Sequence, residues 1–98
     1  MESSYPEGKF CVVRTHSAGV HVGVLAQRAG KEVLLYDARR IWNWQGRNTL
    51  HEIAAQGVGK GSKVSEPVES ILLTEAIEII PTTEDGEANL RAAAWGTK

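Results

Sequence analysis

Residues 10–41 have the sequence FCVVRTHSAGVHVGVLAQRAGKEVLLYDARRI, and this stretch decides the fold. It contains three segments that favour strands, at residues 10–17, 20–26 and 32–41: the first is rich in β-branched residues, the second alternates valines, and the third contains the run Val33-Leu34-Leu35-Tyr36. Ala18-Gly19 and Ala29-Gly30 separate the segments, and glycine adopts the positive φ of tight turns at little cost. The second segment places its valines at every other position, so they share one face. The stretch therefore predicts three sequential antiparallel strands joined by short turns.

The segment 42–47 interrupts the strand pattern, and the signals of a helix follow it. Thr49 and Glu52 fit a capping box, in which the first residue of the motif caps the helix and the fourth reaches back to it. Gly57 is a typical stop residue, because glycine readily takes the left-handed conformation just beyond a helix. The sequence therefore predicts a short helix over residues 50–56.

The rest of the chain predicts further strands and a second helix. Residues 64–68 favour a short strand, limited by Pro67, which has no N–H to donate to a ladder. Residues 71–80 favour a strand or a pair of strands. Thr83 fits the N-cap of a final helix over residues 84–95, whose acidic first turn suits the positive end of the helix dipole.

The predicted order is three strands, a helix, one or two strands and a helix. This order indicates a small α+β domain, with an antiparallel β-meander that forms a curled sheet or partial barrel and two short helices packed against it. A length of 98 residues fits one domain. We expect residues 1–8 to form a flexible N-terminus and residues 9–98 to form a single domain.

The composition is that of an ordinary globular protein, with 42% hydrophobic and 23% charged residues, which argues against disorder. No apolar run approaches the roughly 18 residues that cross a bilayer. The first residues lack the basic start and apolar core of a secretory signal. We therefore expect a cytoplasmic protein with no membrane partner.

The net charge of −1 is unevenly distributed along the chain. Residues 1–63 hold nine Lys and Arg against five Asp and Glu, whereas residues 64–98 hold two against seven. Such a distribution fits two faces that meet between subunits, a basic patch for an anionic ligand, or chance.

The sequence offers no recognised metal or catalytic motif. Cys11, the single cysteine, lies in an apolar run and is typical of a buried hydrophobe, so no intramolecular disulfide is available. His16, His21 and His51 have no cysteine or acidic residue at a zinc-binding spacing. Signatures of hydrolases, transferases and dinucleotide-binding enzymes are lacking. We therefore expect no metal, no cofactor and no enzymatic activity.

The densest group of chemically active side chains follows the third predicted strand. If that strand continues, Arg40, Trp42 and Trp44 share one face, and Arg39 and Ile41 share the other. Guanidinium groups bind phosphates through paired N–H donors, and indole rings stack on bases or cations. The same residues are also typical anchors of a core or a subunit interface.

The glycine-rich loop at residues 57–62 departs from the order of a P-loop, because Gly61 rather than Ser or Thr follows Lys60. Its backbone N–H groups and Lys60 could still contact an anion. The predicted ligand-binding residues are Arg39, Arg40, Trp42, Trp44, Arg47, His51 and Lys60.

The stretch from residue 12 to residue 95 resembles a family of small phage and prophage proteins that carry a domain of unknown function. The resemblance rests mainly on the run Ala-Arg-Arg-Ile-Trp-x-Trp at residues 38–44, on Gly46, on residues 49–54 and 73–81, and on Trp95. It implies a setting, the cytoplasm of an infected or lysogenic bacterium, and no activity that can be carried over.

Three hypotheses from different classes remain open. The first, which we favour, is a non-enzymatic homo-oligomer that binds and sequesters a phosphate-bearing small molecule, such as a nucleotide immune signal of the host. The second is a virion accessory protein or an interaction module that inhibits a host protein, with the tryptophans as interface anchors. The third is nucleic-acid binding, which the net charge of −1 and the lack of a long basic stripe disfavour.

Overall fold

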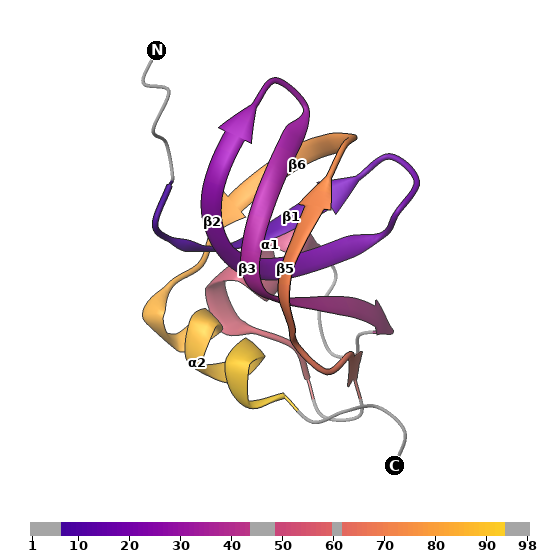
Figure 1. The fold of residues 1–98 in the computed structure, drawn as a ribbon. Helices are drawn as coiled ribbons and strands as arrows, with labels where there is room; N and C mark the ends of the chain where they lie inside the picture. The colour runs from indigo at the N-terminus through magenta and orange to yellow at the C-terminus, as the bar shows by residue number, and fades with distance from the viewer. Residues whose placement is uncertain (1–6, 44–48, 60–61, 94–98) are drawn as a thin grey trace.

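A computed structural model describes residues 7–43, 49–59 and 62–93 of the chain. Six strands and two helices follow one another within these ranges (Figure 1). They are β1 (Phe10–Thr15), β2 (Val20–Ala29), β3 (Glu32–Asn43), α1 (Leu50–Gln56), β4 (Lys63–Val64), β5 (Val68–Leu73), β6 (Ala76–Pro81) and α2 (Glu84–Ala92).

The six strands form one antiparallel sheet in the order β4-β3-β2-β1-β6, and β5 also pairs with β3. The first three strands are the predicted meander. The sheet curls so far that its two ends approach each other at one corner. There the Ala76 N–H donates to the Lys31 carbonyl at 3.0 Å, and the His16 N–H donates to the Glu75 carbonyl at 2.9 Å. The sheet is not closed. Together with the two helices, this curled sheet confirms the predicted α+β class.

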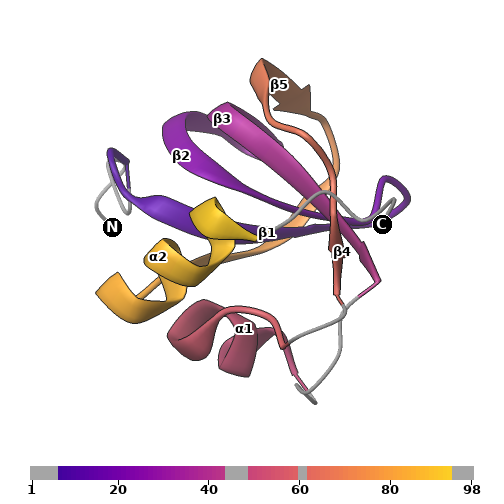
Figure 2. The ribbon, with the colours of Figure 1, turned by 90° about the horizontal axis from the view of Figure 1, so that it is seen from below.

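Apolar side chains fill both faces of the sheet. On one face, which we call the helix side, the two helices cover the sheet (Figure 2). The other face lies inside the curl and is filled by the strands alone. The buried helix-side residues are Phe10, Val12, Val20, Val22, Ile41, Ile53, Ala54, Val58, Val64 and Leu90. Those of the inner cluster are Cys11, Val13, Leu25, Val33, Leu35, Ala38 and Leu73.

Both helices begin at the predicted capping threonines. The Thr49 hydroxyl accepts from the Glu52 N–H at 3.3 Å, and the Thr83 hydroxyl accepts from the Gly86 N–H at 3.0 Å. Each hydroxyl thus satisfies one of the backbone donors that the first turn of a helix leaves free. The helices cross closely at Gly86, where a side chain would collide with the Ala54 carbonyl oxygen.

Several boundaries differ from the sequence-based predictions. The strand predicted over 64–68 is wrong, because β4 ends at Val64 and β5 begins only at Val68, with Pro67 in the connection between them. The prediction of a strand pair over residues 71–80 is confirmed, because β5 ends at Leu73 and β6 begins at Ala76, but β5 starts earlier, at Val68. Trp42 lies within β3 rather than beyond it. The described part of α2 ends at Ala92, short of the predicted end at residue 95. In the described ranges, none of the helices has the length and apolarity to span a membrane.

Candidate functional site

A bulge in β3 decides which side chains reach which face of the sheet. Asp37 has a positive φ of 52°, and two residues of β3, Asp37 and Ala38, oppose the single residue Gly23 of β2, because Tyr36 pairs with Val24 and Arg39 with Val22. Asp tolerates this left-handed conformation better than most residues. Beyond the bulge the alternation changes phase, so that Arg39 turns toward the helix side together with the buried residues there.

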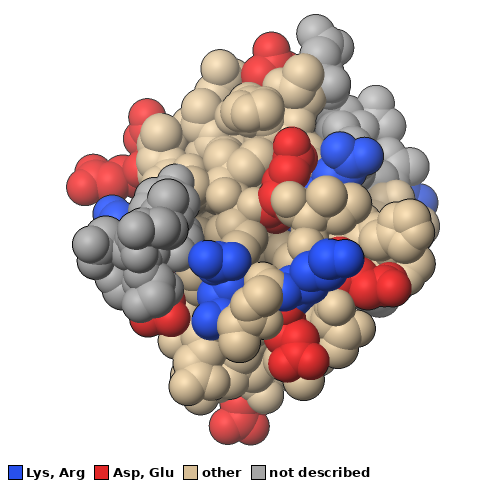
Figure 3. All heavy atoms as spheres, turned by 90° about the horizontal axis from the view of Figure 1, so that it is seen from above, with Lys and Arg blue, Asp and Glu red and all other residues tan. Residues whose placement is uncertain are grey.

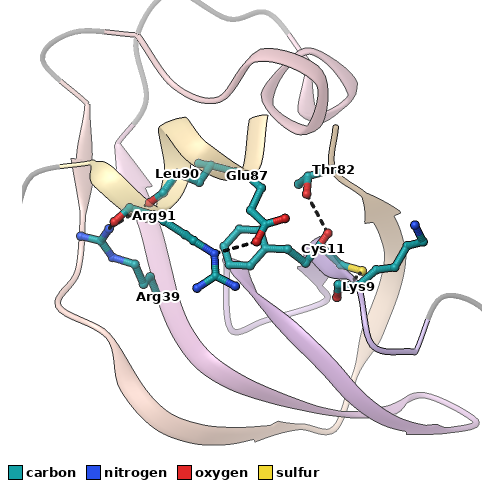
Figure 4. A network of polar contacts seen from close by, with 8 residues as sticks. Lys9, Cys11, Arg39, Thr82, Glu87, Leu90 and Arg91 are labelled. Carbon is teal, nitrogen blue, oxygen red and sulfur yellow. Dashed lines mark hydrogen bonds and ion pairs between the residues drawn. The ribbon is translucent and has the colours of Figure 1, made fainter. Parts of the chain in front are cut away.

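Arg39 is buried, with 8% of its surface exposed, and its guanidinium holds the end of α2 to the sheet (Figure 4). It donates to the carbonyls of Leu90, Arg91 and Ala93 at 2.9, 3.0 and 2.7 Å, and to the Ser65 carbonyl at 2.8 Å. Burial lowers the pKa of Arg39 from its ordinary value. Four of its five N–H groups are therefore used inside the fold, and we leave Arg39 out of the proposed ligand contacts.

Arg40 faces away from the helices and is exposed. Ser65 fixes its backbone from both sides, since the Arg40 N–H donates to the Ser65 hydroxyl and the Ser65 N–H donates to the Arg40 carbonyl, each at 2.8 Å. Its guanidinium lies against Gly19, where a Cβ would come within 3.2 Å of two of its nitrogens. Gly19, with φ of 88°, thus supplies both the turn and the room for the Arg40 side chain.

His21 pairs with Arg40 across the β2–β3 ladder and is 5% exposed. Its Nδ1 atom is buried and has no hydrogen-bond partner among the described residues. Burial, and secondly the charge of Arg40, lower the pKa of His21 from 6.5. The His21 imidazole is therefore neutral near pH 7.

Trp42 is 51% exposed on the same face as Arg40. Lys63 reaches it from β4, with the ammonium nitrogen 5.1 Å from the centre of the indole ring. The pairing of Asn43 with Lys63 across the β3–β4 ladder creates this contact. We call the group formed by Arg40, Trp42 and Lys63 the Trp42 patch. Within the described ranges, the Arg40 and Lys63 side chains have no carboxylate at ion-pair distance.

The other predicted ligand-binding residues do not join this patch in the described structure. Trp44, Arg47 and Lys60 lie outside the described residues. His51 is exposed on α1, the helix that packs against the opposite face of the sheet. Sequence reasoning missed Lys63, because only the β3–β4 pairing brings it to Trp42.

Hollows also lie elsewhere on the described surface, and two of them are lined by charged side chains. The larger, of about 490 Å³, lies where β1, the Asp37 bulge and the end of α2 meet, and Arg39, Glu66 and Arg91 line it. Its charges are of both signs, and Arg91 stacks over the Phe10 ring at 4.6 Å. The smaller hollow, of about 280 Å³, lies at the corner where the sheet nearly closes. Its Glu75 carboxylate accepts from the Ser17 hydroxyl at 2.7 Å.

Other chemically reactive groups are engaged or isolated in the described structure. Burial raises the pKa of the Cys11 thiol to about 11, so that the thiol stays protonated at neutral pH. Its sulfur lies 3.4 Å from the Lys9 carbonyl. Among the described residues, His, Cys, Asp and Glu side chains form no group of three that could hold a metal ion.

The chain belongs to a family defined by a domain of unknown function, DUF6948, whose model matches residues 8–90. No curated protein and no solved structure matches the chain.

Proposed function

We propose that this DUF6948 chain is a binding protein, and that the Trp42 patch binds a phosphate-bearing aromatic small molecule such as a nucleotide. The observation that supports the proposal is a half-exposed tryptophan flanked by two cations that lack carboxylate partners in the described structure. An indole face stacks on a base, a guanidinium binds a phosphate through two N–H groups, and an ammonium adds a point charge.

The energies of the competing contacts favour a ligand at this patch. In the free protein Lys63 lies over the Trp42 ring, a contact worth about 0.5–1 kcal/mol at an exposed position. A base that stacks on the same ring gains about 1–3 kcal/mol. Lys63 is then released toward the phosphate, beside Arg40. The exchange replaces one weak contact by stacking and two charge-assisted hydrogen bonds.

The patch is an open face, so a ligand bound to it would keep one side in water. A second subunit could cover that side, and we therefore propose a homo-oligomer with the ligand between subunits. The resemblance to phage and prophage proteins supports a role in the bacterial cytoplasm. There the protein would sequester a nucleotide signal of host immunity without changing it chemically.

Two alternatives to this function differ in how well the surface supports them. Trp42 could instead anchor a protein partner, since half-exposed tryptophans are frequent hot spots of interfaces. Nucleic-acid binding has less support, because the net charge is −1. On the face shown in Figure 3, moreover, basic and acidic side chains are interspersed rather than gathered into a basic stripe.

Native mass spectrometry with a panel of nucleotides and cyclic nucleotides tests the proposal. We expect a defined oligomer that gains the mass of an intact ligand. Arg40→Ala and Trp42→Ala should weaken binding at least tenfold, whereas Arg28→Ala, an exposed arginine near the β2–β3 turn, should leave it unchanged. Normal binding by both patch variants would show that the site is elsewhere. Release of an altered ligand would show that the protein is an enzyme.

A further inference from the structure

In the described structure several strand edges of the open sheet are unpaired, and the two longest run along β5 and β6. In the described structure β5 pairs only with β3, and β6 pairs only with β1. Figure 2 shows β5 at the border of the sheet, next to β3. No backbone hydrogen bond joins residues 68–73 to a segment other than β3 within the described ranges. The outer N–H and C=O groups of β5 are thus available to another strand.

The free edges are unusually apolar for strands that face water. Leu72 on β5 is 56% exposed and Ile77 on β6 is 54% exposed, and Val68 is also exposed. Leu72 pairs with the partly buried Leu34 of β3, and exposed Tyr36 lies two residues further along that strand. Together Leu34, Tyr36 and Leu72 form an apolar surface next to the free edge. Such a long apolar edge is a template for strand addition.

The chain segment that contains both edges is acidic. Residues 64–90 contain seven Asp and Glu and no Lys, Arg or His. Glu69 lies within β5, and Glu66 and Glu75 lie at either end of it; all three are exposed. Both free edges belong to this acidic stretch. Pairing of the free edge of one copy with that of another therefore brings like charges together and is disfavoured.

We propose that β5 binds an extended, basic segment of a partner protein as an additional strand of the sheet. The partner segment alternates apolar side chains, which contact Leu72 and Tyr36, with Lys or Arg, which pair with Glu66 and Glu69. Backbone hydrogen bonds to the free edge provide affinity, and the acidic flanks select a basic strand over an acidic one or a second copy. This inference is independent of nucleotide binding at the Trp42 patch.

A synthetic peptide of alternating lysine and valine, as long as β5, tests the inference with the isotope-labelled full chain. We expect the peptide to shift the amide NMR signals of residues 68–73 and to bind more weakly as salt is raised. A peptide with the lysines and valines in two separate blocks should bind at least tenfold more weakly, because it cannot present one apolar face. A glutamate–valine peptide should not bind.

Charge reversal on the edge provides the matched comparison. Glu69→Lys should weaken binding of the lysine–valine peptide at least tenfold. Glu84→Lys makes the same change in net charge on α2 and should change binding less than twofold. Circular dichroism verifies that both variants are folded.

Four results would overturn the inference: no binding of the lysine–valine peptide, equal binding of the glutamate peptide, signal shifts confined to another element, or equal effects of the two reversals. Sedimentation of the protein without peptide tests whether a second copy of the chain occupies the β5 edge. A dimer whose interface protects the β5 amides would show that a second copy occupies the edge, against the charge argument.

Discussion

Replacing Arg39 by methionine should lower the free energy of unfolding far more than the same replacement at Arg40. Arg39 is buried and donates four hydrogen bonds, three of them to carbonyls at the C-terminal end of α2. Arg40 is exposed, and its side chain rests on Gly19. The two neighbours are thus a matched pair for separating a structural arginine from a surface one.

The expected loss in the free energy of unfolding can be estimated from the hydrogen bonds that Arg39→Met removes. Hydrogen bonds from a charged donor contribute about 1.5–3 kcal/mol each, but their sum overestimates the loss, because methionine also avoids the burial of a charge. The hydrogen bonds to the Ser65, Arg91 and Ala93 carbonyls are only partly buried, so these three carbonyls can recover water, whereas the bond to the Leu90 carbonyl is buried. We therefore expect a loss of about 3 kcal/mol, the low end for breaking a buried charged network. In a domain of this size, that lowers Tm by roughly 12–24 °C.

Urea unfolding followed by far-UV circular dichroism measures this free energy directly. Arg40→Met should change the free energy of unfolding by less than about 0.5 kcal/mol, as surface substitutions generally do. Hydrogen exchange should show that Arg39→Met exposes the α2 amides first. The reasoning is refuted if Arg39→Met is as stable as the natural protein, or if Arg40→Met loses as much stability.

Three further predictions concern the core. Gly86→Ala should destabilise the protein by about 1–3 kcal/mol in urea unfolding, because its Cβ would collide with the Ala54 carbonyl oxygen and separate the helices. Ala88→Ser, a small enlargement at an exposed position of the same helix, is the control. Because the pKa of His21 is lowered in the folded protein, the unfolded chain binds a proton more readily as the pH falls. The free energy of unfolding should therefore fall as the pH drops below 6.5, and His21→Gln should reduce this dependence. The Cys11 thiol, with a pKa of about 11, should react with a disulfide reagent at about pH 8 only when urea unfolds the protein; equal rates in the folded state would contradict its burial.

The elements that depend on local sequence were predictable. Alternating valines give the meander, and Thr49 and Thr83 cap the two helices as expected. What the sequence could not provide depends on contacts between distant residues. Arg39 meets the Leu90 carbonyl 51 positions later, and Lys63 meets Trp42 only because β4 pairs with β3. Neither contact leaves a local pattern, so the sequence alone does not separate the buried Arg39 from the exposed Arg40 or associate Lys63 with Trp42.

The bulge at Asp37 explains why two adjacent arginines have such different surroundings. Strict alternation from Val33 and Leu35, both in the inner cluster, would place Arg39 on the inner face and Arg40 on the helix side. The extra residue shifts the phase, so that Ala38 joins the inner cluster and Arg39 reaches α2 instead. Arg40 and Trp42 then face solvent together. The anchoring of α2 and the geometry of the Trp42 patch therefore depend on one backbone irregularity, and a change that removed it would alter the stability of the fold and the proposed site together.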